Sequence, residues 1–329
     1  MKKIFITGGA GYIGARLVPI LLKKNFKVTV YDTFFFGNTL KKNKNLKIIK
    51  GDIRNIKRLS NSSKNHDVFL HLACISNDTS YELNKKLSKS VNFDCFEPMV
   101  IEAKKNHIKR FIYASSSSVY GVSKKKNVKE NHPLLPLTLY NKYKGLCEPL
   151  LFKHTTKDFS GVIFRPATVC GYSPRMRFDL SVNILTNFAY NKKLINVFGG
   201  NQLRPNLHIL DYCDAVLKLI NAPKSKINNK IFNVGHQNMS ISNIANLVKR
   251  IVSHKIKKKI QIFTSKSNDK RSYHINSDKI YKELNFKPKR GIEEAVLEIY
   301  KSFEKGFFSK SFDNINYYNV KKMIKLKVK

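Results

Sequence analysis

Tryptophan is absent from this chain of 329 residues, and both cysteine and acidic residues are scarce. The cysteines are odd in number and scattered without a Cys-x-x-Cys pair; they are Cys74, Cys95, Cys147, Cys170 and Cys213. This usage argues against a disulfide framework and against a zinc site, and it favours reduced thiols in a cytoplasmic protein. Apolar runs are short as well. None approaches the roughly 18 residues of a membrane helix, so we expect no membrane insertion.

The acidic residues number 22 against 62 basic ones, which gives a formal net charge of +40. A charge of this size raises the question of nucleic-acid binding. The basic residues are 51 lysines spread over the whole length and only 11 arginines, whereas proteins that grip phosphate groups more often cluster arginine. We therefore interpret the charge as compositional drift on a solvated surface. Nucleic-acid binding is kept as a lesser alternative, and it predicts one contiguous basic face.

Short runs rich in Val, Ile and Phe alternate with helix-length segments through the first half of the chain. The runs are 2–8, 27–32, 46–52, 67–73, 110–116 and 160–169, and helical spacing appears between them, for example at 13–25 and 92–107. Apolar runs without alternation suit the strands of a parallel sheet that is covered on both faces. The sequence therefore predicts an α/β fold with a Rossmann-type, doubly wound parallel sheet.

The alternation of strand-like runs and helix-length segments becomes less regular after about residue 170, which predicts a second, smaller lobe interleaved with the sheet. We expect residues 1–169, with a return segment at about 208–240, to form the Rossmann domain. Residues 170–207 and 241–310 would form the smaller lobe. The last residues, 311–329, are a basic tail that we expect to be loosely ordered.

The first strand is followed directly by the stretch "TGGAGYIG", with glycines at positions 8, 11 and 14. Gly8 permits a tight turn, Gly11 lets the backbone approach a pyrophosphate, and Gly14 allows close helix packing. The next helix would present its free N–H groups to the phosphates. Asp32 ends the second strand, where a carboxylate accepts both ribose hydroxyls of NAD and repels the 2′-phosphate of NADP. The pattern therefore predicts a domain that binds NAD.

The spacing Gly-x-x-Gly-x-x-Gly resembles that of the extended short-chain dehydrogenase/reductase family, the NAD-dependent nucleotide-sugar epimerases and dehydratases of the UDP-glucose 4-epimerase type. "GDIR" (51–54), "HLAC" (71–74) and "SVNFD" (90–94) follow in the family's order. The resemblance implies further NAD contacts at Tyr12, Ile13, Asn38, Asp52, Ile53, Leu72, Ala73 and Asn92.

A Tyr-x-x-x-Lys pattern stands in "LYNKYKG", with Tyr140 and Lys144 on one face of a helix. A tyrosine has a pKa of about 10, so we expect the ammonium of Lys144 and the positive nicotinamide to favour its phenolate. Lys144 can also hold the nicotinamide ribose. The interval between Tyr140 and the serines of "ASSSSVYG" matches the family, which implies that Ser116 is the catalytic hydroxyl.

Two neighbouring serines indicate which reaction to expect. Ser117 and Ser118 occupy the places where sugar 4,6-dehydratases carry Asp and Glu, and a serine hydroxyl is neither acid nor base at neutral pH. The resemblance therefore implies an epimerase of a nucleotide-diphosphate sugar, acting at C4 through a transient keto sugar. A keto-sugar reductase would use the same residues and remains the alternative.

The family's substrate contacts are implied by three later stretches, "FRPATVCGYSPRMRFD", "VFGGNQLRPNLHILDYCDA" and "DKRSYHINSDKIYKELNFKP". Arg204 and Arg271 would clamp the diphosphate, because a planar guanidinium pairs with phosphate oxygens bidentately. Asp211 and Asp214 are expected to be structural. The further candidates are Ser117, Thr168, Arg175, Arg177 and Asn183.

The resemblance also implies a homodimer formed through two helices. Pro98 and Pro149 fall within those segments, and an interior proline costs about 3 kcal/mol and kinks a helix. We therefore expect bends in the dimer helices.

Overall fold

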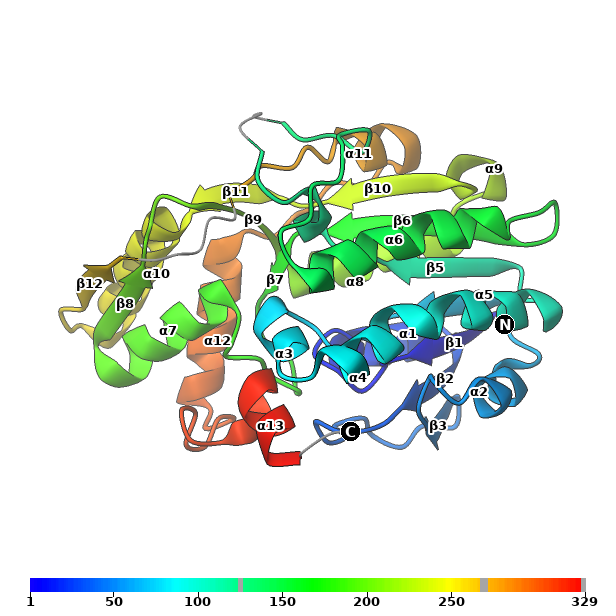
Figure 1. Ribbon diagram of the computed structural model, residues 1–329. Helices are drawn as coiled ribbons and strands as arrows, with labels where there is room; N and C mark the ends of the chain where they lie inside the picture. Colours follow the sequence, from blue (N-terminus) through cyan, green and yellow to red (C-terminus); the bar gives the residue numbers. More distant parts are fainter. Residues whose placement is uncertain (124–126, 267–271, 327–329) are drawn as a thin grey trace.

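The computed structural model describes residues 1–123, 127–266 and 272–326, and its largest element is a seven-stranded parallel sheet (Figure 1). The strand order is β10-β6-β5-β4-β1-β2-β3. The strands are β1 (Lys3–Thr7), β2 (Lys27–Asp32), β3 (Leu46–Lys50), β4 (Val68–His71), β5 (Arg110–Ala114), β6 (Ser160–Pro166) and β10 (Lys230–Val234). The chain runs outward from β1 to β3 and then crosses to β4 on the other side of β1. This reversal is the topological switch point of a doubly wound sheet.

Helices cover both faces of this sheet, so its inner strands are apolar on both sides, whereas the edge strand β3 is largely exposed. In β1, Ile4 and Ile6 pack into one core cluster and Phe5 into another. The first cluster is completed by α1 (Gly14–Lys23) and α8 (Ile209–Asn221), and the second by α2 (Ile56–Ser63), α5 (Phe96–Lys105) and α6 (Leu139–Lys153). The predicted Rossmann-type α/β fold is confirmed.

A smaller lobe lies beyond the carboxyl ends of these strands (Figure 1). Its three-stranded sheet is made of β7 (Thr168–Cys170), β9 (Leu203–His208) and β11 (Gln237–Ser240). A two-stranded sheet is made of β8 (Leu194–Phe198) and β12 (Gln261–Ser265). The helices α7 (Ser181–Lys192), α10 (Ile241–Ile256) and α12 (Ile292–Glu304) pack around a separate apolar cluster.

The two parts are interleaved along the chain. After α8, the short helix α9 (Lys224–Ile227) leads into β10, which pairs in parallel with β6, so the return segment joins the first sheet. The helix α11 (Asp278–Leu284) lies within the range predicted for the smaller lobe. Its residues Ile280 and Leu284 nevertheless pack in the same cluster as Phe232 and Val234 of β10. The contribution of residues 241–310 is therefore divided between the lobe and the main sheet.

The prolines of the two expected dimer helices lie at different positions within their helices. Pro98 lies in the first turn of α5, where a missing N–H costs no helical hydrogen bond. The short helices α3 (Asp78–Glu82) and α4 (Lys85–Lys89) and the π-helix η1 (Ser90–Asp94) precede it. Pro149 lies inside α6, and Pro19 lies inside α1 as well. Of the two dimer helices, α6 is thus the one with an interior proline.

The carboxyl-terminal segment is folded as far as it is described. A 3₁₀ turn, η3 (Ile315–Tyr317), is followed by α13 (Asn319–Leu326). Asn319 and Met323 are buried and lie one helical turn apart, whereas Lys321 and Lys325 face solvent. The loose tail expected from composition is therefore an amphipathic helix held by two buried residues.

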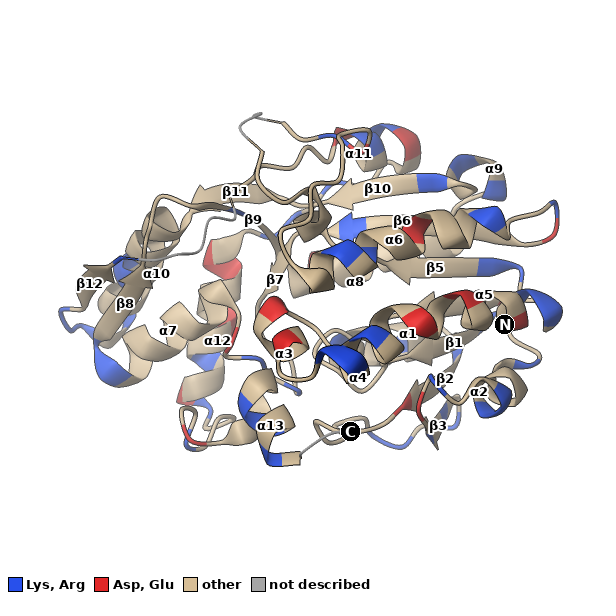
Figure 2. Ribbon diagram, in the orientation of Figure 1, with Lys and Arg blue, Asp and Glu red and all other residues tan. Residues whose placement is uncertain are grey.

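The basic residues are spread over the whole molecule. Figure 2 shows Lys and Arg on elements of the main sheet, its helices, the lobe and α13, with acidic residues between them. This distribution counts against a nucleic-acid-binding face. In the described part of the chain, no helix combines the length and the apolar character needed to cross a bilayer.

Candidate active site

A cleft of about 650 Å³ opens where the carboxyl ends of the main strands meet the smaller lobe. Asp32, which ends β2, and Asp52, just after β3, line one end of it, which we call the β3 end. Ser116 and Tyr140, near the end of β5, line the other, which we call the β5 end. Four strand intervals separate β3 from β5, about 19 Å at the usual spacing. An extended ligand the length of a dinucleotide can therefore lie across the sheet edge.

The glycine loop between β1 and α1 needs its glycines for close approach. Gly8 has φ of +73°, and a Cβ there would lie 2.6 Å from the backbone of Ala73 after β4. A Cβ on Gly14 would lie 2.1 Å from the carbonyl oxygen of Gly9. The loop thus packs closely against the strand ends, and α1 begins at Gly14, directly after the cleft-lining residues Tyr12 and Ile13.

Asp32 organises the backbone at the β3 end. Its carboxylate accepts hydrogen bonds from the N–H groups of Ala10 (3.0 Å) and Phe34 (2.8 Å), one on each oxygen. Burial nevertheless raises the pKa of Asp32. Each oxygen keeps a lone pair, so the carboxylate can accept two more donors from a ligand, as two neighbouring ribose hydroxyls would provide.

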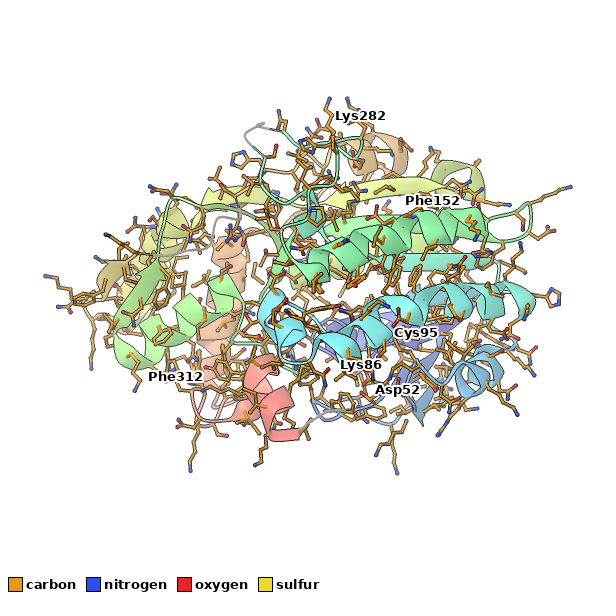
Figure 3. The ribbon with its side chains drawn as sticks, viewed as in Figure 1. Asp52, Lys86, Cys95, Phe152, Lys282 and Phe312 are labelled. Carbon is orange, nitrogen blue, oxygen red and sulfur yellow. The ribbon has the colours of Figure 1, made fainter. Side chains whose placement is uncertain are left out.

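Asp52 lies beside β3 (Figure 3) and is paired with an arginine that the sequence analysis did not single out. The guanidinium of Arg54 binds both of its oxygens, with an Nη2–Oδ2 distance of 2.6 Å, and it also contacts Ser90 at 3.4 Å. Ile53 between them is buried and lines the cleft. Arg54 could have been found from "GDIR", where it lies two residues after Asp52.

Four residues expected to contact ligands hold the protein instead. Asn92, in η1, accepts from the N–H of Ile75 (2.8 Å) and donates to its carbonyl (3.0 Å), so it fixes a cleft-lining strand end. Asn183 bonds Gly171 and Arg177 within the lobe and Tyr12 of the glycine loop. Asn38 accepts from Leu40 N–H (3.0 Å). These three and Gly14 are not among the described residues that line the cleft.

The remaining predicted site residues within the described part of the chain all line the cleft. They are Gly8, Gly11, Tyr12, Ile13, Asp32, Asp52, Ile53, Leu72, Ala73, Ser116, Ser117, Tyr140, Lys144, Thr168, Arg175, Arg177 and Arg204. Arg271 lies outside the described residues.

Tyr140 and Lys144 lie on α6 at the β5 end. The Lys144 ammonium is buried, donates to the carbonyl oxygen of Ala114 (2.7 Å) and lies 5.1 Å from the ring centre of Tyr113. Burial raises the pKa of Tyr140 well above its usual value, with Cys74 and Asp78 adding to the effect and Arg177 opposing it. The effect of Lys144 expected from the sequence therefore does not overcome burial in the protein alone.

The four serines have different partners. Ser116 caps the 3₁₀ turn η2 (Ser117–Tyr120), and its Oγ lies 2.7 Å from Ser118 Oγ. Ser118 in turn donates to the side-chain oxygen of Asn141, the residue after Tyr140. Ser116, Ser117 and Ser118 all line the cleft. The serine run thus places a chain of hydroxyls next to Tyr140.

Ser115 points away from the other serines into a buried network. Its hydroxyl donates to Glu148 of α6 (2.6 Å), and Glu148 forms a buried ion pair with Arg165 of β6 at 2.5 Å. Arg165 donates to the Tyr120 hydroxyl (2.7 Å), which donates to Asn233 (2.7 Å). This network ties both ends of the serine run to the sheet. No local sequence pattern indicated this network, because its members come from four separate segments.

On the lobe side, Thr168 of β7 and Arg204 of β9 line the cleft. Arg177 is held by Asp179 (Nε–Oδ1 2.8 Å) and by Ser76 (3.1 Å), and its charge acts on Tyr140. Asp211 accepts from Arg290, as does Asp214, so both are structural as expected. Arg177 is therefore placed near the β5 end.

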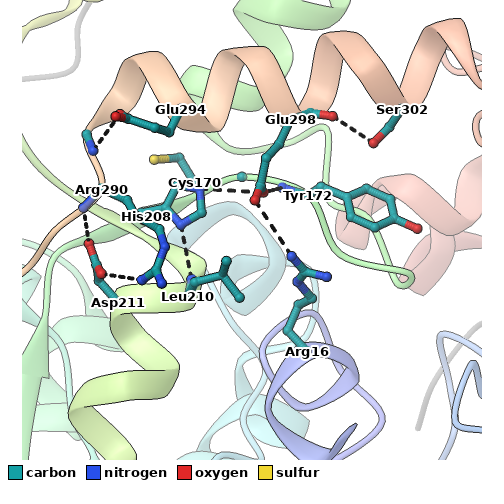
Figure 4. A network of polar contacts seen from close by, with 12 residues as sticks. Arg16, Cys170, Tyr172, His208, Leu210, Asp211, Arg290, Glu294, Glu298 and Ser302 are labelled. Atoms are coloured by element: carbon teal, nitrogen blue, oxygen red, sulfur yellow. Dashed lines mark hydrogen bonds and ion pairs between the residues drawn. The ribbon is translucent and has the colours of Figure 1, made fainter. Parts of the chain in front are cut away.

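The lobe is joined to the glycine loop by a polar network away from the cleft (Figure 4). Glu298 of α12 lies 3.7 Å from Arg16 of α1 and 3.5 Å from the buried His208, and it accepts from the Tyr172 N–H at 3.4 Å. Tyr12 donates to the Gly171 carbonyl at 2.7 Å. Tyr12 and Arg16 thus connect the glycine loop and α1 to the segment after β7 and to α12.

Comparison with known proteins decides the family. The family model described as "NAD dependent epimerase/dehydratase family" matches residues 4–235. The chain belongs to this family. It is 26% identical over 318 residues to a probable UDP-arabinose 4-epimerase 3 from Oryza sativa subsp. japonica, covering 86% of this chain and 77% of the relative.

Within the epimerase/dehydratase family, similar relatives carry out different reactions. The chain is 30% identical to a UDP-N-acetyl-alpha-D-glucosaminuronate decarboxylase from Bacillus cytotoxicus, covering 74% of this chain and 78% of the relative. Its structure is similar to that of a UDP-glucuronic acid 4-epimerase from Bacillus cereus in complex with UDP-glucuronic acid and NAD. That match has a TM-score of 0.82 and 26% identity, covering 92% of this chain and 99% of the other. The family's cofactor is NAD, and the glycine loop and Asp32 fit it.

Proposed function

We propose that this chain is an NAD-dependent epimerase that inverts C4 of a nucleotide-diphosphate sugar through a transient 4-keto sugar. One observation carries the proposal. Tyr140, Lys144 and Ser116 line the β5 end of the cleft, whereas the adjoining positions 117 and 118 carry hydroxyls and not carboxylates. This set of groups can move a proton on and off a sugar hydroxyl but has no acid–base pair for removing water.

The residues of the chain would act as follows. Tyr140 takes the proton of the C4 hydroxyl and later returns one to the keto oxygen, and Ser116 hydrogen-bonds the same oxygen. When bound, NAD would supply the hydride chemistry at C4. Since burial raises the pKa of Tyr140, the positive charges of Lys144 and the bound nicotinamide are needed to populate its phenolate.

Asp78 is the carboxylate whose position would most directly suggest an acid or base for a dehydration. It begins α3, lines the cleft and raises the pKa of Tyr140 by its charge. Its Oδ1 accepts from the Thr138 hydroxyl at 2.5 Å, which holds it at the start of α6. A single carboxylate fixed in this way supports orientation of Tyr140, not the paired acid and base of a dehydration.

The test is a screen of UDP-, dTDP-, GDP- and CDP-sugars with the purified chain, read by mass spectrometry and NMR. An epimerase gives a product of unchanged mass, an inverted carbon and no net change in nicotinamide absorbance. Loss of water or carbon dioxide would contradict the proposal, and so would substrate-dependent consumption of NADH or NADPH, which would identify a keto-sugar reductase. The Tyr140→Phe variant is the inactive control.

We also propose that the chain is a homodimer formed through α5 and α6. Leu146, in the middle of α6, is 41% exposed and presents an apolar side chain on a helix expected at the dimer interface. Light scattering after size exclusion tests this. Wild type should elute as a dimer and Leu146→Glu as a monomer, whereas a monomeric wild type would contradict the proposal.

A further inference from the structure

Arg175 is a buried arginine whose hydrogen-bond donors are not all paired. It lies between β7 and α7, is 4% exposed, and its guanidinium lies 4.2 Å from the ring centre of Phe36. One nitrogen donates to Asn319 Oδ1 at 2.5 Å, but its Nε has no hydrogen-bond partner among the described residues. Burial and the neighbouring Arg177 lower its pKa to about 9, against the attraction of Asp179 and Asp32. Arg175 lines the cleft, so acceptor atoms of a ligand bound there can complete the pairing that a buried guanidinium requires.

Asn319 ties the carboxyl-terminal helix to this arginine. Besides accepting from Arg175, its side chain donates to Ser76 Oγ (2.9 Å), and its backbone N–H donates to Asp179 (3.2 Å). Asn319 is 4% exposed and lines the cleft. The first turn of α13 is thus anchored to both the lobe and the strand end after β4.

Met323, one turn further along α13, forms an apolar wall of the same cleft. It packs in a cluster with Ile75 and Leu87, and Phe36 lies against that cluster. Phe36 therefore touches both Met323's cluster and the Arg175 guanidinium. Arg175, Phe36 and Met323 line the cleft together with Asp32 and Ile53 of the β3 end, and the charge of Asp32 acts on Arg175.

We propose that Arg175, Asn319 and Met323 complete the cofactor site, and that α13 thereby covers the adenosine half of bound NAD. The chemistry of this surface matches that half: an apolar wall for adenine, a carboxylate for the ribose hydroxyls and a buried cation for the phosphate and ribose oxygens. The inference rests on the family's use of NAD and not on which sugar reaction follows. It reassigns Arg175 from the substrate to the cofactor.

A covered cofactor has a functional consequence. In an epimerase the hydride returns to the sugar in each cycle, so NAD need not leave, whereas a reductase must exchange its nicotinamide after every turnover. A helix that closes over the adenosine half slows dissociation. Slow NAD release would therefore agree with the proposed epimerase. The release rate is measured without any sugar, so it can be tested separately from the epimerase activity.

The experiment compares NADH release from wild type, Asn319→Ala, Met323→Ala and Arg175→Met by stopped-flow fluorescence, with excess NAD as the trap. Each variant should release NADH about tenfold faster, which corresponds to about 1.4 kcal/mol. Ile324→Ala, on the same helix but at a side chain that is 59% exposed, is the matched control and should behave as wild type. UDP affinity, measured by calorimetry, should stay the same in all four variants.

Release rates within twofold of wild type in all three site variants would overturn the proposal. Hydrogen–deuterium exchange on the wild-type chain gives a second test that does not depend on the variants folding. Amides of α13 should become protected when NAD is added, and unchanged protection would overturn the proposal as well. If the chain does not bind NAD, both this proposal and the cofactor assignment are overturned. If only the epimerase assay fails, the proposed function is overturned, and the NADH release rates still decide this proposal.

Discussion

The two ends of the cleft differ in the side chains that line them. At the β3 end, Asp32 is locked by two backbone N–H groups and Arg175 stacks on Phe36, so charges are held in fixed positions. At the β5 end, Ser116, Ser118 and Tyr140 present hydroxyls, two of them within 2.7 Å of each other, beside the charges of Lys144 and Arg177. Fixed charges suit binding of a ligand that does not change, and hydroxyls suit proton transfer. One end is thus organised to retain the cofactor and the other to react.

The difference extends to what supports each end. The β5 end is backed by the buried Glu148–Arg165 pair, which belongs to α6 and β6. The β3 end is backed by α13, which follows all the other described elements in the chain. Reaction and retention can therefore be disturbed separately.

The largest expected effect is on catalysis at the β5 end. Tyr140→Phe removes the only proton that the residue can transfer, and loss of a general acid–base group costs about 10²–10⁴-fold in rate. NADH affinity should remain within twofold of wild type, because the β3 end is untouched. Initial rates on the accepted sugar and fluorescence titration of NADH check both parts. A variant with full activity would refute the proposed mechanism.

A large effect on stability should follow from breaking the buried pair behind the serines. Glu148→Gln leaves Arg165 with an uncompensated charge, and loss of one partner of a buried pair costs about 3–5 kcal/mol. Urea unfolding followed by circular dichroism measures it. Glu97→Gln, which disturbs the surface contacts to Lys153 and His154, is the matched control and should change stability far less. Equal effects would contradict the structural role of the network.

An intermediate effect is expected on affinity at the β3 end. Asp32→Asn removes the charge and replaces one acceptor with a donor, and hydrogen bonds to a charged group contribute about 1.5–3 kcal/mol. NAD should therefore bind about ten- to a hundredfold more weakly, and discrimination against NADP should fall. Calorimetry with both cofactors is the measurement. Unchanged selectivity would show that Asp32 only organises the glycine loop.

The parts of the site that the sequence predicted are those built from neighbouring residues. The glycine loop, Asp32 and the Tyr140–Lys144 pair are recognisable because turn geometry and helical spacing fix their sequence intervals. The strand runs were recognisable for the same reason, since buried parallel strands are continuously apolar.

Residues whose role depends on distant partners could not be predicted in this way. Asn92 and Asn183 were expected at ligands, yet both bond the backbone of other segments. The basic composition of the tail suggested disorder, because nothing local showed that Asn319 would meet Arg175, 144 positions away. The spacing of Asn319 and Met323 was the one available signal, and four residues are too few to interpret alone.

The smallest effect should come from the hydroxyl behind the catalytic serine. Ser118 receives the Ser116 contact at 2.7 Å and donates to Asn141, so it sets the direction of the Ser116 hydroxyl without being the group proposed to bond the sugar. Ser118→Ala removes both of these hydrogen bonds, and the one that orients Ser116 is worth about 0.5–1.5 kcal/mol, so kcat should fall by up to about tenfold. The KM for the sugar and the release of NADH should not change, and Ser118→Thr should restore kcat because it keeps the hydroxyl. A rise in KM, or no rescue by threonine, would mean that Ser118 supports the fold of η2 and not the reacting hydroxyl. The two ends of the cleft would then be less independent than their separate contacts indicate.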